Sequence, residues 1–286
     1  MSEACNSCSR GSQCEGGSCP PGPEKKENIK NVIAVMSGKG GVGKSSVTAL
    51  LAASLSQRGY KVGIMDADVT GPSIPRIFGL KGGSLNNGAR GIIPAKTGGG
   101  IEVISLNLLL PSEDEPVIWR GPVIAGVVTQ FWTEVEWGEL DYLLIDMPPG
   151  TGDVPLTVMQ TLPLNGVMVV TTPQGLVSMI VQKAVNMAAK MQIPVIGMIE
   201  NFSFVECPDC HKRINLFGEN HSEEMAGKNA VPILGRLPLD PDFVTHCDSG
   251  LIEEYLKRDS LVKENITGAV DLLIKKFSGV TPGSAL

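Results

Sequence analysis

Aromatic residues and positive charge are both scarce in this chain of 286 residues. Phe, Trp and Tyr together make up 5% of the sequence, and the formal net charge is −6 at pH 7. Proteins that bind nucleic acids usually carry a basic face, and those that bind single strands need aromatic rings on which bases stack. The composition therefore argues against nucleic acid as the main partner.

The chain also lacks a hydrophobic run of the length that crosses a bilayer, which is roughly 20 residues. Its first residues contain no apolar stretch typical of a signal peptide. We therefore expect a cytoplasmic protein with no membrane contact. In a reducing compartment, cysteine thiols bind metals or take part in redox chemistry more often than they form disulfides.

Residues 1–28 contain almost no apolar side chain and are rich in Ser, Gly, Pro, Glu and Lys. Such a segment has nothing with which to bury a core, so we predict a flexible, cysteine-rich tail. Residues 29–286 are long enough to bury a core without disulfides, and we predict that they form one domain.

Short apolar runs rich in β-branched residues alternate with helical segments in this domain. The runs span residues 32–36, 62–65, 103–106, 142–145, 167–170 and 195–199, and two of the helical segments span 45–58 and 176–191. Nearly continuous apolar runs of this kind are typical of parallel strands buried on both faces. We predict an α/β fold with a mostly parallel sheet, helices on both faces, and ligands at the carboxyl ends of the strands.

A last helix is expected over residues 260–277, where apolar residues recur on one face from Val262 to Phe277. One interpretation is a helix that lies on a membrane surface. The opposite face mixes lysines with Glu264 and Asp271, which favours packing of this helix against the domain.

The most specific motif is Gly-Lys-Gly-Gly-Val-Gly-Lys-Ser at residues 38–45, which matches G-x-x-x-x-G-K-[ST] between a predicted strand and a predicted helix. Glycines let backbone N–H groups turn toward phosphate oxygens, and the start of the helix adds its positive dipole end. Lys44 is expected to reach the β- and γ-phosphates and Ser45 to ligate Mg²⁺. The predicted nucleotide-binding residues of this P-loop are Gly38, Gly40, Gly41, Val42, Gly43, Lys44, Ser45 and Ser46.

Carboxylates follow two of the predicted strands. Asp146 ends the run 142–145, where P-loop proteins place a carboxylate that holds Mg²⁺ through water. The Pro/Gly turn after it includes Gly150, whose N–H is expected to sense the γ-phosphate. Asp66 and Asp68 follow another run, and they either serve the same nucleotide or cap the next helix.

Lys39, a second lysine inside the P-loop, is not required by the basic phosphate cradle. With it the sequence resembles the deviant P-loop ATPases, which include the nitrogenase iron protein, the arsenite-pump ATPase and the division-site and partition ATPases. The resemblance implies an ATP-sandwich homodimer in which Lys39 crosses to the partner's nucleotide. It also implies that Asp66 serves the Mg²⁺ site, that Asp68 positions the attacking water beside Lys44, and that Asn201 contacts adenine.

Cys207 and Cys210 form a Cys-x-x-Cys, in which both thiolates can face one metal. A thiolate site for zinc or for a [4Fe–4S] cluster needs four ligands, and two such pairs meeting across a two-fold axis would supply them. Two alternatives are a zinc site within one chain that adds His211 and Cys247, and a thioredoxin-like redox pair. Cys247 by itself is expected to be a small buried residue.

Several motifs occur together and in order. They span residues 37–45, 66–73, 119–122, 146–153, 172–174 and 200–203, the last leading into the cysteine pair. Together they closely resemble the Mrp/ApbC-type iron–sulfur cluster carrier ATPases, which include the cytosolic cluster-scaffold ATPases of eukaryotes. The resemblance implies a fold like that of the nitrogenase iron protein and ATP hydrolysis. It also implies that Cys207 and Cys210 help hold a labile [4Fe–4S] cluster between two copies, or between this chain and a paralogue, for transfer to apo-proteins.

Two other functions stay open at this point, a positioning ATPase of the partition type and an ATP-coupled electron donor. The tail adds four more cysteines, Cys5, Cys8, Cys14 and Cys19. Their spacing resembles part of a cluster motif found in extended members of the scaffold family. A second cluster, a zinc ion and an unligated tail are the three alternatives for them.

Overall fold

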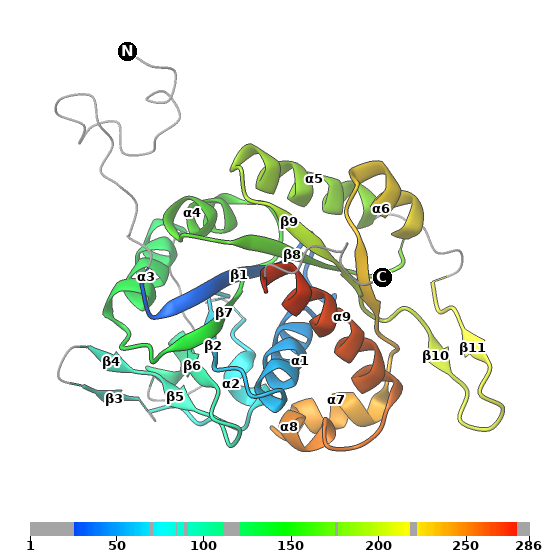
Figure 1. The fold of residues 1–286 in the computed structure, drawn as a ribbon, viewed down its shortest axis with the longest axis horizontal. Helices are drawn as coiled ribbons and strands as arrows, with labels where there is room; N and C mark the ends of the chain where they lie inside the picture. Colours follow the sequence, from blue (N-terminus) through cyan, green and yellow to red (C-terminus); the bar gives the residue numbers. More distant parts are fainter. Residues whose placement is uncertain are drawn as a thin grey trace, which may run out of the picture.

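The computed structural model describes residues 26–68, 71–83, 85–88, 91–110, 121–174, 177–217 and 222–278. The four tail cysteines, Trp119 and Arg120 lie outside these residues. Eight strands form the main sheet (Figure 1). Their order across it is β12 (Ile233–Arg236), β9 (Val195–Glu200), β8 (Gly166–Thr171), β1 (Ile29–Ser37), β7 (Leu140–Asp146), β2 (Val62–Asp66), β6 (Glu102–Ile104) and β5 (Ala95–Lys96).

All neighbouring pairs in this sheet are parallel except β5 and β6. The central strands are buried along almost their whole length, and every residue of β8 is buried. Strands covered on both faces need apolar side chains pointing both ways, which explains the continuous runs in the sequence. The predicted mostly parallel sheet is confirmed.

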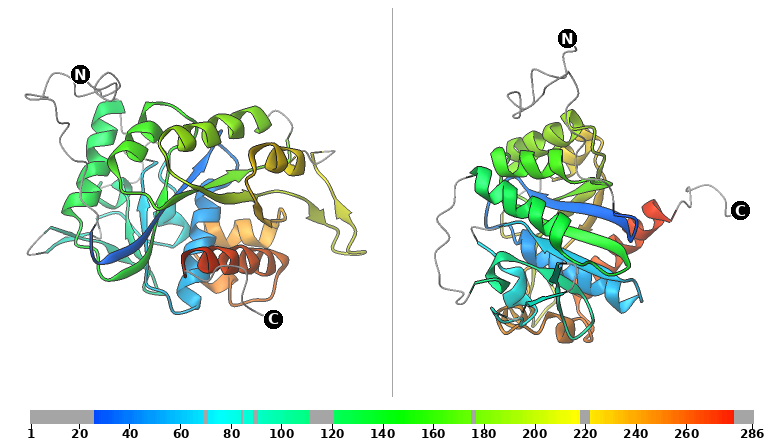
Figure 2. Two further views of the ribbon diagram at one scale, coloured as in Figure 1. Left: turned by 45° about the horizontal axis from the view of Figure 1, so that its top comes forward. Right: turned by 90° about the vertical axis from the view of Figure 1, so that its left-hand side faces the viewer.

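Helices cover both faces of the sheet, as predicted (Figure 2). One layer consists of α1 (Lys44–Gln57), α2 (Ile74–Ile77), α7 (Pro241–Asp248), α8 (Ile252–Tyr255) and α9 (Leu261–Phe277). The other consists of α3 (Gly121–Glu134), α4 (Asp153–Thr161), α5 (Val177–Lys190) and α6 (Ser222–Asn229). Each layer closes its own hydrophobic cluster against the sheet.

The expected strand over residues 103–106 is wrong at its end. β6 stops at Ile104, and Leu106 begins a 3₁₀ turn, η2 (Leu106–Leu108). The chain bends because Leu108 N–H donates to Ser105 O at 3.1 Å, while the Ser105 hydroxyl is held by Asp66. The short edge strand β12 and two small hairpins, β3 (Asn86–Asn87) with β4 (Ile92–Ile93) and β10 (Val205–Glu206) with β11 (Arg213–Ile214), were not expected from the sequence.

The last helix packs on the domain. Ser260 caps α9 by accepting from Lys263 N–H at 3.1 Å, and the apolar face that begins at Val262 is buried against α1 and β12. The mixed charges of the opposite face therefore remain in solvent. Within the described ranges, we find no helix with the length and apolar character needed to span a bilayer.

Candidate functional site

The P-loop connects the carboxyl end of β1 to the start of α1, as its motif predicts. Gly41 and Gly43 have φ angles of +77° and +75°, a left-handed backbone that glycine adopts without steric cost. Two such residues wrap the loop around the N-terminus of α1, where backbone N–H groups have no partner within the helix. This is the arrangement in which a P-loop accepts phosphate oxygens.

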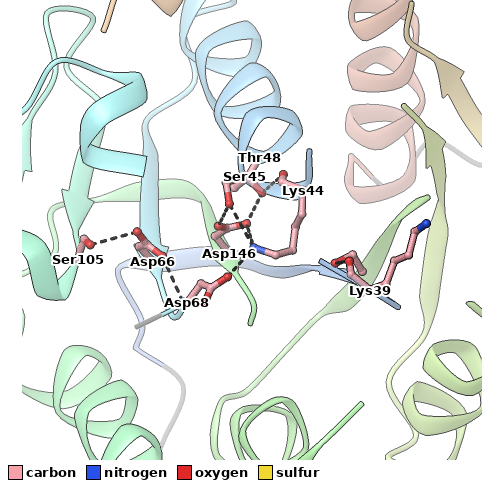
Figure 3. A network of polar contacts seen from close by, with 9 residues as sticks. Lys39, Lys44, Ser45, Thr48, Asp66, Asp68, Ser105 and Asp146 are labelled. Atoms are coloured by element: carbon pink, nitrogen blue, oxygen red, sulfur yellow. Dashed lines mark hydrogen bonds and ion pairs between the residues drawn. The ribbon is translucent and has the colours of Figure 1, made fainter. Parts of the chain in front are cut away.

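Lys44, Ser45 and Asp146 form a compact network at this end of the sheet (Figure 3). Lys44 Nζ lies 2.8 Å from Asp146 Oδ1 and 3.8 Å from Asp68 Oδ2, and the Ser45 hydroxyl donates to Asp146 Oδ2 at 2.6 Å. Asp146 is fully buried, so its charge is stabilised by these donors rather than by water. The structure thus brings together three residues that the sequence placed about 100 positions apart.

Thr48 belongs to the same network, although the sequence analysis missed it. Its hydroxyl donates to Asp146 Oδ1 at 2.8 Å and is buried. It lies one helical turn after Lys44, on the same face of α1, and that spacing was the available signal. A polar side chain there satisfies a carboxylate that would otherwise have fewer hydrogen bonds in the core.

Asp66 and Asp146 pair in register at the ends of β2 and β7. Asp66 accepts a hydrogen bond from the Ser105 hydroxyl at 3.1 Å and another from Asp68 N–H at 3.2 Å. Burial, followed by the charge of nearby Asp146, raises the pKa of Asp66 to about 8. Carboxylates gathered in this way attract a cation, which makes the edge suitable for Mg²⁺ held together with phosphate oxygens.

Lys39 points away from the Lys44 network, and its Nζ donates to Oε1 of Gln174, which follows β8 (Figure 3). The predicted role of Lys39 at a partner's nucleotide stays a prediction. The N–H of Gly150, expected beside the γ-phosphate, donates to Ser37 O at 2.9 Å.

A pocket of about 450 Å³ opens at the P-loop. Six of the predicted P-loop residues line it: Gly40, Gly41, Val42, Gly43, Lys44, Ser45; Ser46 and Asp68 also do. Its opposite wall comes from α2 and α7, through Arg76, Ile77, Phe243, Val244 and Cys247. No local motif marks α7, so only the folded chain shows that this helix faces the P-loop. Gly38, Asp66, Asp146 and Asn201 do not line the pocket.

Asn201 supports the P-loop from behind. Its Nδ2 donates to Val42 O at 3.0 Å, and its side chain is buried. A Cβ on Gly43 would lie 2.3 Å from Asn201 Nδ2, so Gly43 is needed for this close approach as well as for its φ angle. The next residue, Phe202, lines the pocket with a φ angle of +54°. The predicted contact of Asn201 with adenine stays a prediction.

Five residues beyond Phe202, the chain enters the tip of the β10–β11 hairpin, which carries the cysteine pair. Cys207 N–H donates to Lys212 O at 3.0 Å, and His211 N–H donates to Cys207 O at 2.9 Å, which closes the tip. The backbone N–H groups of Cys210 and Asp209 point at the Cys207 sulfur and hold its pKa below the usual value. Donors aimed at sulfur favour the thiolate, which is the form that binds metal.

The structure does not assemble the zinc site within one chain that was one alternative. Cys247 is buried in α7 beside the P-loop pocket, as expected for a small core residue, and burial raises its pKa to about 12. Among the described residues, no group of three or more His, Cys, Asp or Glu side chains is placed to hold a metal. The cysteine pair also lies on a hairpin rather than at the start of a helix, unlike a thioredoxin-type pair.

Comparison with known proteins decides the family. The profile described as ParA, NUBPL iron-transfer P-loop NTPase, matches residues 28–274. The chain belongs to this family. Relatives of this NUBPL-type NTPase include an iron-sulfur cluster carrier protein of Clostridium perfringens, 47% identical over 90% of this chain and 96% of that protein. Another is the cytosolic Fe-S cluster assembly factor CFD1 of Chaetomium globosum, 42% identical over 85% of this chain and 86% of that one.

Solved structures agree with this NUBPL-type assignment. A nucleotide-binding protein of Archaeoglobus fulgidus, solved in complex with ADP, is 48% identical, with a TM-score of 0.72 over 80% of this chain and 89% of that chain. The cell division ATPase MinD of Pyrococcus furiosus has a TM-score of 0.62 over 86% of this chain and 99% of that chain at 20% identity, a likeness of fold alone.

Proposed function

We propose that this chain is an ATP-dependent carrier of a [4Fe–4S] cluster, which it holds between two copies and passes to apo-proteins. The observation that carries the proposal is the combination of a formed P-loop site with an exposed pair of cysteines that begins five residues after Phe202. Its relatives named as iron–sulfur cluster carriers support the cargo, and the ADP-bound relative supports the nucleotide. We also place its action in the cytoplasm, in keeping with relatives described as cytosolic.

Hydrolysis at this site depends on positioning and on neutralising charge. Lys44 and Lys39 would offset the negative charge of the phosphates, and Asp68 would orient the attacking water. Mg²⁺ fits the oxygen donors present, since Ser45 and Asp146 would hold it, and when bound it supplies further positive charge to the phosphates.

The cysteine pair supplies two of the four ligands that the cluster needs. Two copies would therefore share it through Cys207 and Cys210 of each. Transfer is then an exchange of thiolate ligands from the carrier to the client, with no net electron transfer. We propose that nucleotide binding changes the geometry of the four thiolates, because the Asn201–Phe202 segment contacts the P-loop and leads into the hairpin.

Anaerobic reconstitution with iron and sulfide tests the cargo. We expect the wild type to bind about four irons per dimer at the hairpin, with a Mössbauer spectrum of a [4Fe–4S] cluster, and the Cys207→Ala/Cys210→Ala variant to lose them. Removal of residues 1–25 leaves the Lys26 hydrogen bond to Val135 O in place. Iron that disappears with this segment belongs to the tail cysteines, for which we propose a second cluster.

A reversible redox cycle that follows ATP hydrolysis, with no loss of the cluster to an apo-acceptor, would instead support an electron donor. A colourless protein with stoichiometric zinc would overturn the carrier proposal. The coupling itself would be refuted by unchanged cluster transfer in cells that carry the Lys44→Ala variant.

A further inference from the structure

The β10–β11 hairpin stands out from the body of the molecule in both views that show it from the side (Figures 1 and 2). Each of its strands contains two residues, and the cysteine pair forms the connection between them. The hairpin is therefore small, and its faces are set by the register of a few residues.

The register separates a charged face from an apolar face. Val205 pairs with Ile214, and Glu206 pairs with Arg213. Because side chains alternate along a strand, Val205, Cys207 and Ile214 share one face, while Glu206 and Arg213 share the other. The cysteine that begins the metal-binding motif thus lies on the apolar face.

The charged face turns toward the body of the protein. The Arg213 guanidinium lies 4.6 Å from the ring centre of Phe204, which is 7% exposed. The apolar face is consequently left to solvent, and Ile214 is 47% exposed. Leu216 and Phe217 follow it at 46% and 37% exposed.

Three large apolar side chains within four positions are unusual on a surface. Single exposed apolar residues are ordinary, but a contiguous patch marks an interaction site. Here the patch adjoins a cysteine pair that supplies only half the thiolates of a cluster. A two-fold axis through this region would bring the same face of another copy, with its own Cys207, against it.

We propose that the apolar hairpin face, formed by Val205, Ile214, Leu216 and Phe217, docks on the same face of a second copy and holds the four thiolates together. This inference rests on the proposed function, since a shared cluster is what requires two hairpins to meet. The patch is small beside the roughly 800 Å² per partner of a stable interface. The contact is therefore weak by itself and acts together with the shared cluster.

An Ile214→Ser/Leu216→Ser variant tests the docking, because it removes apolar surface and leaves both cysteines in place. The matched control is Leu251→Ser/Leu272→Ser, two leucines that are each 48% exposed and lie on α9 and just before α8. The Cys207→Ala/Cys210→Ala variant gives the level of iron and of dimer without the shared site. All four full-length proteins are reconstituted anaerobically without nucleotide, and iron content and sedimentation velocity are measured.

We expect the hairpin variant to raise the dissociation constant of the reconstituted dimer about tenfold or more and to fall to the iron content of the cysteine variant. The control should match the wild type. ADP binding checks that each variant is folded, and Ile214→Ala/Leu216→Ala replaces the serine pair if that pair loses ADP binding.

Wild-type iron content and dimer affinity in a folded hairpin variant would overturn the docking and leave the carrier proposal standing. A wild type that holds no more iron than the cysteine variant would overturn the shared cluster and the docking together. The two failures are distinguishable, because only the first retains iron at the hairpin.

Discussion

The nucleotide edge of the sheet and the β10–β11 hairpin differ sharply in how they hold their functional groups. At the edge, Asp66 and Asp146 are at most 1% exposed, and serine, threonine and lysine side chains contact their oxygens at 2.6 to 3.1 Å. On the hairpin, Cys210 is exposed, Cys207 is half-buried, and two residue pairs form the whole ladder.

The difference indicates which task one chain performs alone. A buried network orders its donors and acceptors before any ligand arrives, which favours binding and positioning of phosphates. A small exposed hairpin has few contacts that hold it in one arrangement, and it presents only part of a ligand set. The predictions that follow test whether the first region is complete and whether the second is reactive and incomplete.

Replacement of Lys44 by alanine should have the largest effect. The variant removes the ammonium 2.8 Å from Asp146 and the charge expected at the phosphates. We expect kcat for ATP hydrolysis to fall about a thousandfold, measured by phosphate release. A variant that keeps a tenth of the wild-type rate would contradict the assignment of Lys44.

The two described cysteine environments should differ about a hundredfold in alkylation rate near neutral pH. The thiolate is the reactive form. The lowered pKa of Cys207 populates it at neutral pH, whereas Cys247, with a pKa of about 12, stays protonated. Mass spectrometry of iodoacetamide-treated, metal-free protein measures both rates.

Raising the pH should accelerate the labelling of Cys247 well beyond the pH at which that of Cys207 levels off. In urea the two rates should converge, which serves as the control. Equal rates in the native protein would show that the two environments do not differ as described.

Gly43→Ala should weaken ADP binding about tenfold more than Gly41→Ala. Both glycines have left-handed φ angles, so both variants carry the same kind of backbone strain. Only at Gly43 does the added Cβ meet Asn201 Nδ2 and disturb its bond to Val42 O, because nothing lies within 4 Å of a Cβ at Gly41. Calorimetric titration with ADP compares them, and equal affinities would remove Asn201 from the support of the P-loop.

Lys30→Ala should have the smallest effect. Lys30 pairs with Asp141 at 2.7 Å, as close as Lys44 pairs with Asp146, but its side chain is 70% exposed. Exposed ion pairs add little because water already solvates both charges. ATPase rate and thermal midpoint should match the wild type, and a clear loss of either would mean that distance matters more than burial here.

Much of the nucleotide edge was predictable because its residues belong to local patterns. The P-loop motif placed Lys44 and Ser45 at a strand–helix junction, and the runs before Asp66 and Asp146 placed both carboxylates at strand ends. Thr48 and Ser105 were missed, since a hydroxyl in a helix or after a strand has no distinctive spacing of its own. The α7 wall of the pocket was missed because Phe243 and Val244 reach the P-loop only through the packing of α7 beside α1 and α2.

The sequence alone determined the α/β class, the phosphate-binding loop and the pairing of two cysteines, because period, glycine placement and short spacings are local properties. Only the tertiary structure decided that Asp66 and Asp146 lie in register, that Asn201 holds the P-loop, and that Cys247 is far from metal chemistry. These facts depend on strand order and on burial, which join residues far apart in the chain. The scarcity of aromatic residues and of positive charge excluded one class of partner, and the exposed hairpin face now points to another, a second copy of the chain.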